Sequence, residues 1–260
     1  MRKLEGKVIV ITGAAMGLGL ATAVESAKEG AKLVLVDYNE SALAEAKAHL
    51  TKDFAGLELI TVTADVSDEG EVKAYVDQAV AKFGRIDGFY NNAGIEGKQA
   101  KLAVYDMESF KKVIDINLMG VYYGMRYVIP VMQQQRSGRI VNATSVGGIR
   151  GVLNEGPYVA SKHAVSGLTK NAAVEYAEDG ILVNAIAPGA ILTPMVEEAF
   201  KQMNPQNPKQ AEETFSQNNP SRRLGLPEEV AKLVVFLMSD DCAYVNGQII
   251  AIDGGQSNAY

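Results

Sequence analysis

The chain has 260 residues, of which 47% are hydrophobic and 22% charged, a composition typical of a globular protein with a sizeable core. Thirty-one acidic residues against twenty-five basic ones give a net charge of −6, which argues against nucleic acid as a partner. No apolar run approaches the roughly 18 residues of a membrane span, and the single cysteine excludes an internal disulfide.

Short apolar runs alternate with longer amphipathic segments along the chain. The apolar runs predict strands at residues 8–12, 32–37, 57–64, 86–90, 138–143, 181–187 and 248–252. The amphipathic segments predict helices at residues 17–30, 40–51, 68–84 (with Ser67 as cap), 107–135, 158–179 and 227–239. Strands that are apolar throughout and alternate with helices indicate a parallel sheet covered on both faces. We therefore expect one doubly wound α/β domain over residues 1–260.

One segment does not follow this alternation. Residues 194–226 contain four prolines and many asparagine and glutamine side chains, with only weakly periodic apolar positions. An insertion of this length in a compact domain is usually a functional loop, so the segment predicts a substrate lid. The alternative is a solvated excursion with two short helices.

A glycine-rich turn joins the first strand to the first helix. It reads TGAAMGLG over residues 12–19, and its glycines allow the backbone to approach a pyrophosphate held at the helix N-terminus. The spacing is GxxxGxG rather than the usual GxGxxG, so a tight turn without a ligand is the alternative. The candidate dinucleotide-binding residues of this turn are Gly13, Met16, Gly17, Leu18 and Gly19.

The second predicted strand ends in an acid, Asp37, eighteen residues after Gly19. A carboxylate there can accept hydrogen bonds from the adenosine ribose, whereas it would repel the 2′-phosphate of NADP. The nearby Tyr38 and Met16 supply no positive charge for such a phosphate. The pattern therefore predicts NAD as the cofactor, bound in part by Asp37 and Tyr38.

Two further strand ends carry candidate cofactor-binding residues. Asp65 and Val66 follow the third strand, where the adenine would lie, although Asp65 would serve equally well as a helix cap. Asn92, Ala93 and Gly94 follow the fourth strand, and turn chemistry alone would also account for Asn92.

The stretch GPYVASK at residues 156–162 places Tyr158 and Lys162 four residues apart, on one face of a helix. Ser145 follows the fifth strand, and the carboxyl ends of strands line the ligand crevice of a doubly wound sheet. We expect Ser145 to donate to a substrate carbonyl, Tyr158 to transfer the hydroxyl proton, and Lys162 to lower the pKa of Tyr158. Taken alone, the stretch would also suit an ordinary helix start.

Asn117 is polar among the apolar residues of the predicted 107–135 helix. A polar residue in such a position more often faces solvent or mends a local kink than acts in a site. The sequence has no pattern of metal ligands: the two histidines, His49 and His163, are far apart and have no further ligand residues nearby at the usual spacing. We expect no metal, and the lone Cys242 is typical of the reducing cytoplasm.

Taken in order, these motifs resemble the short-chain dehydrogenase/reductase family over essentially the whole chain. The resemblance is carried by TGAAMGLG at 12–19, NNAG at 91–94, Asn117, Ser145, the Tyr158–Lys162 pair and Pro188-Gly189. It implies a Rossmann-type seven-stranded sheet and hydride transfer between a nicotinamide cofactor and a carbonyl or alcohol carbon.

The same resemblance implies a role for each catalytic residue. Tyr158 would be the acid/base and Ser145 would polarise the carbonyl. Lys162 would bind the nicotinamide ribose and tune Tyr158, and Asn117 would hold a water of the proton relay. The nicotinamide would be supported by Pro188, Gly189, Ile191 and Thr193.

A closer resemblance within the family is to NAD-dependent reductases of cyclic diketones. It is carried by FGRIDGFYNNAGIEGKQ at 83–99, SVGGIRG at 145–151 and IDGGQS at 252–257. It implies that the substrate is bordered by Glu96, Gly147, Gly148, Ile149, Met195 and Val196. Glu96 would be equally at home as a salt-bridge partner within its loop.

The predicted helices at 107–135 and 158–179 carry apolar residues on more than one face. One apolar stripe can cover the sheet while the surplus packs against another subunit, and the family resemblance implies a homotetramer. The alternative is that both helices are buried within one subunit.

Three functions remain in view from the sequence. The first is an NAD-dependent enzyme that interconverts small or cyclic ketones and secondary alcohols. The second is 3-oxoacyl-carrier reduction by the same residues, for which Asp37 and the net charge of −6 are unfavourable. The third is a non-catalytic NAD sensor, which would not need Ser145, Tyr158 and Lys162 together.

Overall fold

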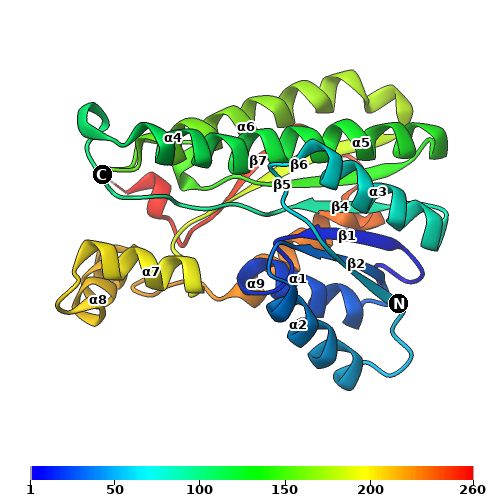
Figure 1. Ribbon diagram of the computed structural model, residues 1–260, viewed down its shortest axis with the longest axis horizontal. Helices are drawn as coiled ribbons and strands as arrows, with labels where there is room; N and C mark the ends of the chain where they lie inside the picture. Colours follow the sequence, from blue (N-terminus) through cyan, green and yellow to red (C-terminus); the bar gives the residue numbers. More distant parts are fainter. Residues whose placement is uncertain (1, 260) are drawn as a thin grey trace.

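Seven parallel strands form one sheet in the order β3-β2-β1-β4-β5-β6-β7 in the computed structural model, which describes residues 2–259 (Figure 1). The strands are β1 Val8–Thr12, β2 Lys32–Asp37, β3 Leu59–Thr63, β4 Gly88–Asn91, β5 Gly138–Ala143, β6 Ile181–Pro188 and β7 Ile249–Ile252. The α-helices are α1 Gly17–Lys28, α2 Glu40–Asp53, α3 Glu69–Phe83, α4 Met107–Ile114, α5 Gly120–Gln135, α6 Gly156–Glu175, α7 Pro194–Met203, α8 Pro208–Asn218 and α9 Pro227–Met238. The doubly wound, parallel Rossmann-type fold expected from the sequence is confirmed.

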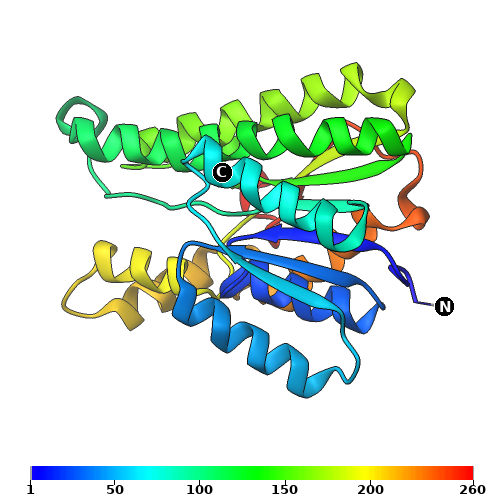
Figure 2. The same cartoon turned by 45° about the vertical axis from the view of Figure 1, so that its right-hand side comes forward.

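Successive residues of the central strands enter opposite hydrophobic cores, which explains why these strands are apolar throughout. Val8 and Val10 of β1 belong to the core under α3, α5 and α6. Ile9 and Ile11 belong to the core under α1, α2 and α9. Figures 1 and 2 show these two groups of helices on opposite faces of the sheet. A strand buried on both faces needs an apolar side chain at every position.

The strand order reverses at β1, which lies between β2 and β4. The chain leaves β1 toward one edge of the sheet and leaves β4 toward the other, so the connections after these strands diverge. This divergence opens a crevice at their carboxyl ends, where doubly wound sheets bind ligands. The turns after β1 and β4 carry TGAAMGLG and NNAG, the motifs that sequence analysis assigned to the cofactor.

The helical stretch expected over residues 107–135 is present without a break, but it is not α-helical throughout. Helices α4 and α5 are separated by a π-helical turn over Asp115–Met119, in which the amide of Gly120 donates to the carbonyl of Asp115. A π turn accommodates one extra residue and rotates the side chains that follow. This rotation turns Asn117 into the protein interior, where its side chain is fully buried.

The expected cap of the third helix is wrong. Asp68, not Ser67, caps α3, because its Oδ1 accepts from the amide of Glu71 at 2.9 Å. The other differences are shifts of the element ends. The largest is in α6, which begins at Gly156, ends at Glu175, and is followed by a short 3₁₀ turn over Ala177–Asp179.

The segment 194–226 forms a helical hairpin that projects beyond the carboxyl edge of the sheet (Figure 1). Helices α7 and α8 pack through the rings of Phe200 and Phe215, whose centroids are 5.7 Å apart. The base of the hairpin is closed by two backbone hydrogen bonds: the amide of Leu192 donates to the carbonyl of Gly225 at 2.9 Å, and the amide of Gly225 donates to the carbonyl of Ala190 at 3.0 Å. The two short helices of the alternative interpretation are therefore present, whatever their role.

Candidate active site

The glycine turn after β1 has a backbone that glycine adopts more easily than any other residue. Gly13 and Gly17 have φ angles of +63° and +54°, in the left-handed region. A Cβ atom on Gly13 would lie 2.9 Å from Nδ2 of Asn92, and one on Gly19 would overlap the carbonyl of Gly13. Helix α1 starts without a side-chain cap and without an acidic residue in its first turn. This helix start therefore suits an anion such as a pyrophosphate.

Asp37 ends β2 with a carboxylate that is only 7% exposed. Its Oδ2 accepts from the amide of Ala15 in the glycine turn at 3.0 Å, and its Oδ1 accepts from the amide of Asn39 at 3.1 Å. Each oxygen can accept a second hydrogen bond, so acceptors for ribose hydroxyls are available. Tyr38 is 76% exposed at the same rim.

Asn92 and Thr12 connect the carboxyl ends of β4 and β1. The side-chain amide of Asn92 donates to the carbonyls of Thr12 at 2.9 Å and Gly13 at 3.2 Å. The hydroxyl of Thr12 accepts from the backbone amides of Asn92 and Ala93 at 2.9 and 3.0 Å. Asn92 therefore holds the glycine turn in shape. Sequence analysis missed Thr12, although its place as the last residue of an apolar strand was a signal.

Asp65 does not cap α3, because Asp68 does. The Asp65 carboxylate is exposed and accepts from the amide and the hydroxyl of Ser67, at 2.9 and 2.7 Å. The next residue, Val66, is buried against α5, where a Cβ atom on Gly120 would lie 2.8 Å from its Cγ2. Val66 therefore anchors the turn that carries Asp65 at the rim of the crevice.

Lys162 lies beside Tyr158 at the carboxyl end of β5. Its Nζ is 5.6 Å from the centroid of the Tyr158 ring and donates to the carbonyl of Ala143 at 2.8 Å. Ser145 follows Ala143 by two residues, and a Cβ atom on Gly147 would lie 3.6 Å from its Oγ and 3.3 Å from the Tyr158 ring, so both side chains flank Gly147. The structure therefore brings Ser145, Tyr158 and Lys162 together as the sequence predicted.

The pKa values in this group depart strongly from their ordinary values. The pKa of Tyr158 is raised to about 12, mainly by burial and in addition by the negative charges of Glu155 and Glu96, against a lowering effect of the neighbouring Ser145 hydroxyl. Burial lowers the pKa of Lys162 to about 8. The expected depression of the Tyr158 pKa is therefore not produced by these side chains alone. At neutral pH the phenol keeps its proton, as an acid that protonates a ketone oxygen must.

Asn117 is fully buried and holds the turn after β4 against α6. Its Oδ1 accepts from the amide of Ile95 at 2.8 Å, and its Nδ2 donates to the Ile95 carbonyl at 2.8 Å and to Oγ of Ser161 at 3.2 Å. A Cβ atom on Gly94 would lie 3.0 Å from Oδ1 of Asn117 and 3.4 Å from Nζ of Lys162. Asn117 thus belongs to the site, and the solvent-facing alternative is wrong.

The loop after β6 carries the residues expected at the nicotinamide. Pro188 ends β6, and a Cβ atom on Gly189 would lie 2.6 Å from Oε1 of Gln256. Thr193 caps α7 by accepting from the amide of Val196, and its methyl group lies 3.5 Å from a Cβ position on Gly17. The start of the helical hairpin therefore lies directly beside the glycine turn.

Of the residues expected at the substrate, Gly147 lies directly beside Tyr158. A Cβ atom on Gly147 would be 3.3 Å from the Tyr158 ring, and a Cβ atom on Gly148 would overlap Oγ1 of Thr144. Ile149 and Met195 are partly exposed, at 39% and 40%, and Val196 follows in the first turn of α7.

Two carboxylates approach Tyr158 from this side. Glu96 accepts from Nε2 of Gln99 at 2.9 Å rather than from a lysine or arginine, and burial raises its pKa. Glu155, which sequence analysis missed, has its pKa raised to about 7 by burial and by the charge of Glu96. Its position three residues before Tyr158, directly before the start of α6, was the available signal.

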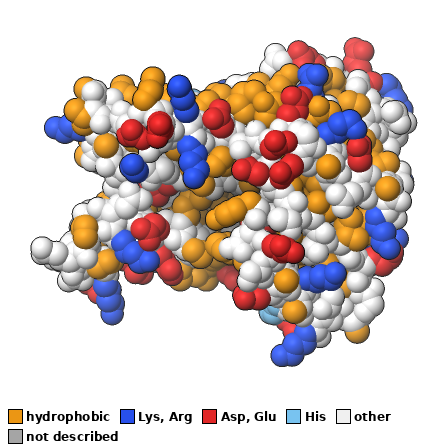
Figure 3. Space-filling model, viewed as in Figure 1, with side chains coloured by type: hydrophobic (Ala, Val, Ile, Leu, Met, Phe, Trp, Pro, Cys, Tyr) orange, Lys and Arg blue, Asp and Glu red, His pale blue; other side chains and the backbone are white. Residues whose placement is uncertain are grey.

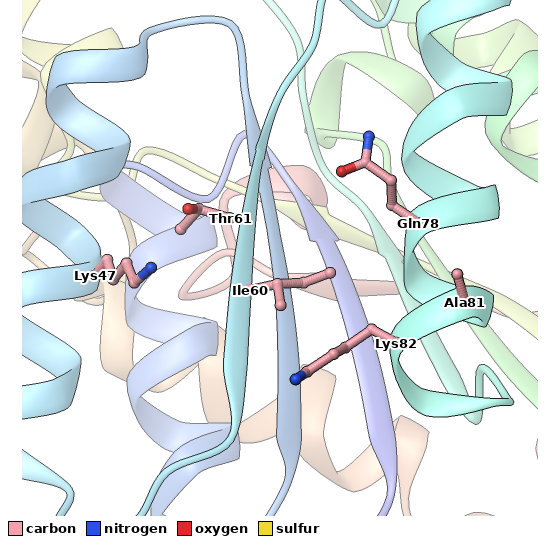
Figure 4. A pocket seen from close by; sticks show the side chains of 6 residues that line it. All are labelled: Lys47, Ile60, Thr61, Gln78, Ala81 and Lys82. Carbon is pink, nitrogen blue, oxygen red and sulfur yellow. The ribbon is translucent and has the colours of Figure 1, made fainter.

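The hollow between α7–α8 and the α4 side of the molecule is visible in Figure 3, with apolar side chains at its floor. A separate groove of about 490 Å³ lies elsewhere, on the open edge of β3 between Lys47 of α2 and Lys82 of α3 (Figure 4). That groove holds none of the site residues. Within residues 2–259, no helix is long and apolar enough to span a membrane, and no group of three or more His, Cys, Asp and Glu side chains is placed to hold a metal ion.

An uncapped helix start lies beside a buried acid, and a half-buried tyrosine lies beside a lysine and a serine at the same edge of the sheet. The first pair suits a dinucleotide and the second suits proton transfer at a carbonyl oxygen. The molecule is therefore an oxidoreductase of the nicotinamide-dependent, Rossmann-type class.

Comparisons with known proteins extend this conclusion. The profile of a family described as enoyl-(acyl carrier protein) reductase matches residues 13–257. Levodione reductase of Leifsonia aquatica is 54% identical over 98% of this chain and 95% of its own. A crystal structure of levodione reductase superposes with a TM-score of 0.98 over 99% of this chain and 100% of that one. The 3-oxoacyl-[acyl-carrier-protein] reductase FabG of Thermotoga maritima is 43% identical over 97% of this chain and 98% of its own.

Two further relatives bear on the cofactor and the substrate. An NAD⁺-bound xylitol dehydrogenase structure has a TM-score of 0.93 at 36% identity, over 97% of this chain and 100% of that one. Cyclohexanol dehydrogenase of an Acinetobacter species is 38% identical over 98% of this chain and 97% of its own. The chain belongs to the short-chain dehydrogenase/reductase family, and it is an alcohol/ketone oxidoreductase that uses NAD(H).

Proposed function

We propose that the protein interconverts a small cyclic ketone or diketone and the corresponding secondary alcohol, with Tyr158 as the acid/base. The observation that carries this proposal is the meeting of three side chains: Ser145 and Tyr158 both flank Gly147, and the Lys162 ammonium lies 5.6 Å from the tyrosine ring. A polarising donor next to a proton donor is what a carbonyl oxygen needs when it becomes an alcohol.

NADH, when bound, supplies the hydride, and the chain supplies the rest of the chemistry. Ser145 donates to the substrate carbonyl and orients it toward Tyr158. Tyr158 then gives its phenolic proton to the oxygen, and the nearby Lys162 ammonium stabilises the phenolate that remains. Asn117 keeps the Gly94–Ile95 turn against Lys162 and thereby positions the lysine, and we infer that it also holds the relay water.

The proposed cofactor contacts run along one edge of the sheet. The pyrophosphate lies on the glycine turn and the adenosine ribose on Asp37 and Tyr38. The adenine lies near Asp65 and Val66, with Asn92, Ala93 and Gly94 opposite, and the nicotinamide lies against residues 188–193. The buried Asp37 carboxylate supports NADH over NADPH because a 2′-phosphate beside it would meet a negative charge.

The substrate class is proposed from the relatives and from the pocket. Cyclohexanol dehydrogenase is named for an alcohol with a six-membered ring, and levodione reductase is named as a reductase of a dione. The partly exposed apolar side chains of Ile149 and Met195 offer a surface for such a ring, and Glu96, Gly147 and Val196 complete its border. We propose that α7 and α8 form the lid over it.

A second candidate is reduction of a 3-oxoacyl group on a carrier protein. It is favoured by the 43% identity to the Thermotoga maritima reductase and by the description of the matching family. An acidic carrier protein needs a basic docking surface, whereas this chain has a net charge of −6 and places Glu96 and Glu155 beside Tyr158. The cyclic-ketone proposal therefore stands first.

We further propose a cytoplasmic homotetramer built on α5 and α6. Val174 of α6 is 81% exposed and Tyr122 of α5 is 38% exposed, and apolar side chains gather over these helices at the upper edge of Figure 3. Such a surface suits a second copy of the chain. Equilibrium ultracentrifugation tests the stoichiometry, and a monomer at micromolar concentration would contradict it.

A panel of initial rates tests the substrate proposal. The purified protein is assayed with NADH and with NADPH against cyclic diketones, acyclic diketones, 3-oxoacyl thioesters and simple secondary alcohols. We expect the highest kcat/KM for a cyclic diketone with NADH. Activity confined to NADPH or to 3-oxoacyl thioesters would retain the catalytic residues but refute the cofactor and substrate assignments.

A further inference from the structure

The C-terminal segment after β7 contacts the loop on which the nicotinamide is proposed to bind. Oε1 of Gln256 accepts from the amide of Ala190 at 3.3 Å, and it lies 2.6 Å from where a Cβ atom on Gly189 would be. The amide of Gly189 donates to the carbonyl of Ile252 at 3.1 Å. The turn at Gly189 and Ala190 is therefore held from the C-terminal side by one side chain and one backbone carbonyl.

The same glutamine is connected to the loop of the catalytic serine. Nη1 of Arg150 donates to the backbone carbonyl of Gln256 at 2.9 Å. The amide of Arg150 donates to the carbonyl of Val146 at 3.0 Å, and Val146 directly follows Ser145. A displacement of Gln256 would therefore reach both the nicotinamide side and the substrate side of the site.

The segment that carries Gln256 is itself a rigid turn. Oδ1 of Asp253 accepts from the amide of Gly255 at 2.9 Å, and Oδ2 accepts from the amide of Ser257 at 2.7 Å. The carbonyl of Asp253 accepts from Nδ2 of Asn219, at the end of the helical hairpin, at 3.1 Å. The turn is thus tied to the hairpin as well, and it forms a fixed point behind three loops of the site.

We propose that Gln256 is a positioning residue for the nicotinamide, which it serves by holding the Gly189–Ala190 turn in the conformation that binds the cofactor. Arg150 is its anchor. The proposal rests on the proposed nicotinamide site at residues 188–193. Because Pro188 and Ile191 flank the turn, any movement of Gly189 and Ala190 changes the surface that these neighbours present.

Two replacements of Gln256 separate this role from a merely structural one. Gln256→Met retains the length of the side chain but loses the acceptor, whereas Gln256→Glu retains an acceptor oxygen for the Ala190 amide. We expect the Kd of NADH, measured by fluorescence titration, to rise about fivefold in Gln256→Met, the effect of one lost hydrogen bond, and to stay within about twofold in Gln256→Glu. Gln248→Met is the matched control, because the Gln248 side chain donates only to the Asn246 carbonyl at 3.0 Å, away from the site, and its NADH affinity should not change.

The anchor is tested by Arg150→Met and by the double variant with Gln256→Met. Each single variant should raise the Kd of NADH. The Kd of the double variant should not exceed the higher of the two single-variant values, because both residues act on one turn. Thermal unfolding of every variant shows whether the fold is intact.

Equal NADH affinity in wild type and Gln256→Met would overturn the positioning role, and so would equal losses in the Met and Glu variants. If Gln256→Met does not fold, an Arg150→Met variant with wild-type NADH affinity overturns it instead. A wild-type protein that fails to bind NADH would overturn the cofactor site itself, which distinguishes the two failures.

Discussion

Replacing Lys162 with methionine should stabilise the fold while abolishing activity. The side chain is 4% exposed, and burial lowers its pKa from 10.5 to about 8. A difference of that size corresponds to about 3 kcal/mol against the charged form at neutral pH. Methionine removes this cost but also the hydrogen bond to the Ala143 carbonyl, which is worth about 1 kcal/mol. We therefore expect the free energy of unfolding at pH 7 to rise by about 1 to 2 kcal/mol.

The free energy of unfolding should also depend on pH through Lys162, in a direction that follows from its pKa. Because the folded-state pKa of Lys162 lies below the unfolded value, the unfolded chain binds more protons between about pH 8 and pH 10. The free energy of unfolding of the wild type should rise with pH in this window, and Lys162→Met should lack that component of the rise. Above about pH 10, Tyr158 acts in the opposite sense, since its pKa of about 12 in the folded state exceeds the unfolded value.

Urea unfolding at pH 7 and pH 9.5 measures both effects, with turnover recorded on the same samples. Lys170→Met is the matched control, because Lys170 lies on the same helix but is exposed. A Lys162→Met protein that is less stable than the wild type at pH 7, or that keeps the full wild-type rise with pH, would refute the assignment of a buried, strained ammonium.

Two further substitutions test the cofactor and the acid pair. Asp37→Ser combined with Tyr38→Arg should shift the ratio of kcat/KM values toward NADPH, because it replaces a repelling carboxylate with a phosphate-binding cation; an unchanged ratio would place the ribose elsewhere. Glu155→Gln removes a negative charge that, in addition to burial, raises the pKa of Tyr158. The pH at which the rate of alcohol oxidation begins to rise should therefore be lower in this variant. The control Glu175→Gln changes an exposed carboxylate and should leave that pH unchanged.

The features that could be predicted from the sequence are those set by local pattern. The run VIVI at residues 8–11 is apolar at every position because β1 is buried on both faces, and this signal requires no knowledge of its neighbours. The Tyr158–Lys162 pair was equally predictable, since four residues along a helix always return to one face.

The features that could not be predicted depend on contacts between distant segments. The π turn at Asp115–Met119 orients Asn117 toward Ile95, 22 residues earlier in the chain, and no periodicity in residues 107–135 reports that contact. The raised pKa of Tyr158 depends on burial and on Glu96, which arrives from the turn after β4.

The two helices of segment 194–226 were expected only in the alternative interpretation, although a local signal favours them. Thr193 and Asn207 each precede a proline, and both act as N-caps with proline in the first turn of α7 and α8. This is a local signal of a helix start. The abundance of proline, asparagine and glutamine obscured it, because the same residues also suit irregular loops.

The central claim is that the phenol of Tyr158 is the proton donor, and Tyr158→Phe tests it most directly. The variant removes one hydroxyl and leaves the ring in place, so NADH affinity should remain within about twofold of wild type. Turnover of a cyclic diketone with NADH should fall by on the order of 10²-fold or more, as expected when general acid catalysis is lost. Turnover within a few-fold of wild type would contradict the account.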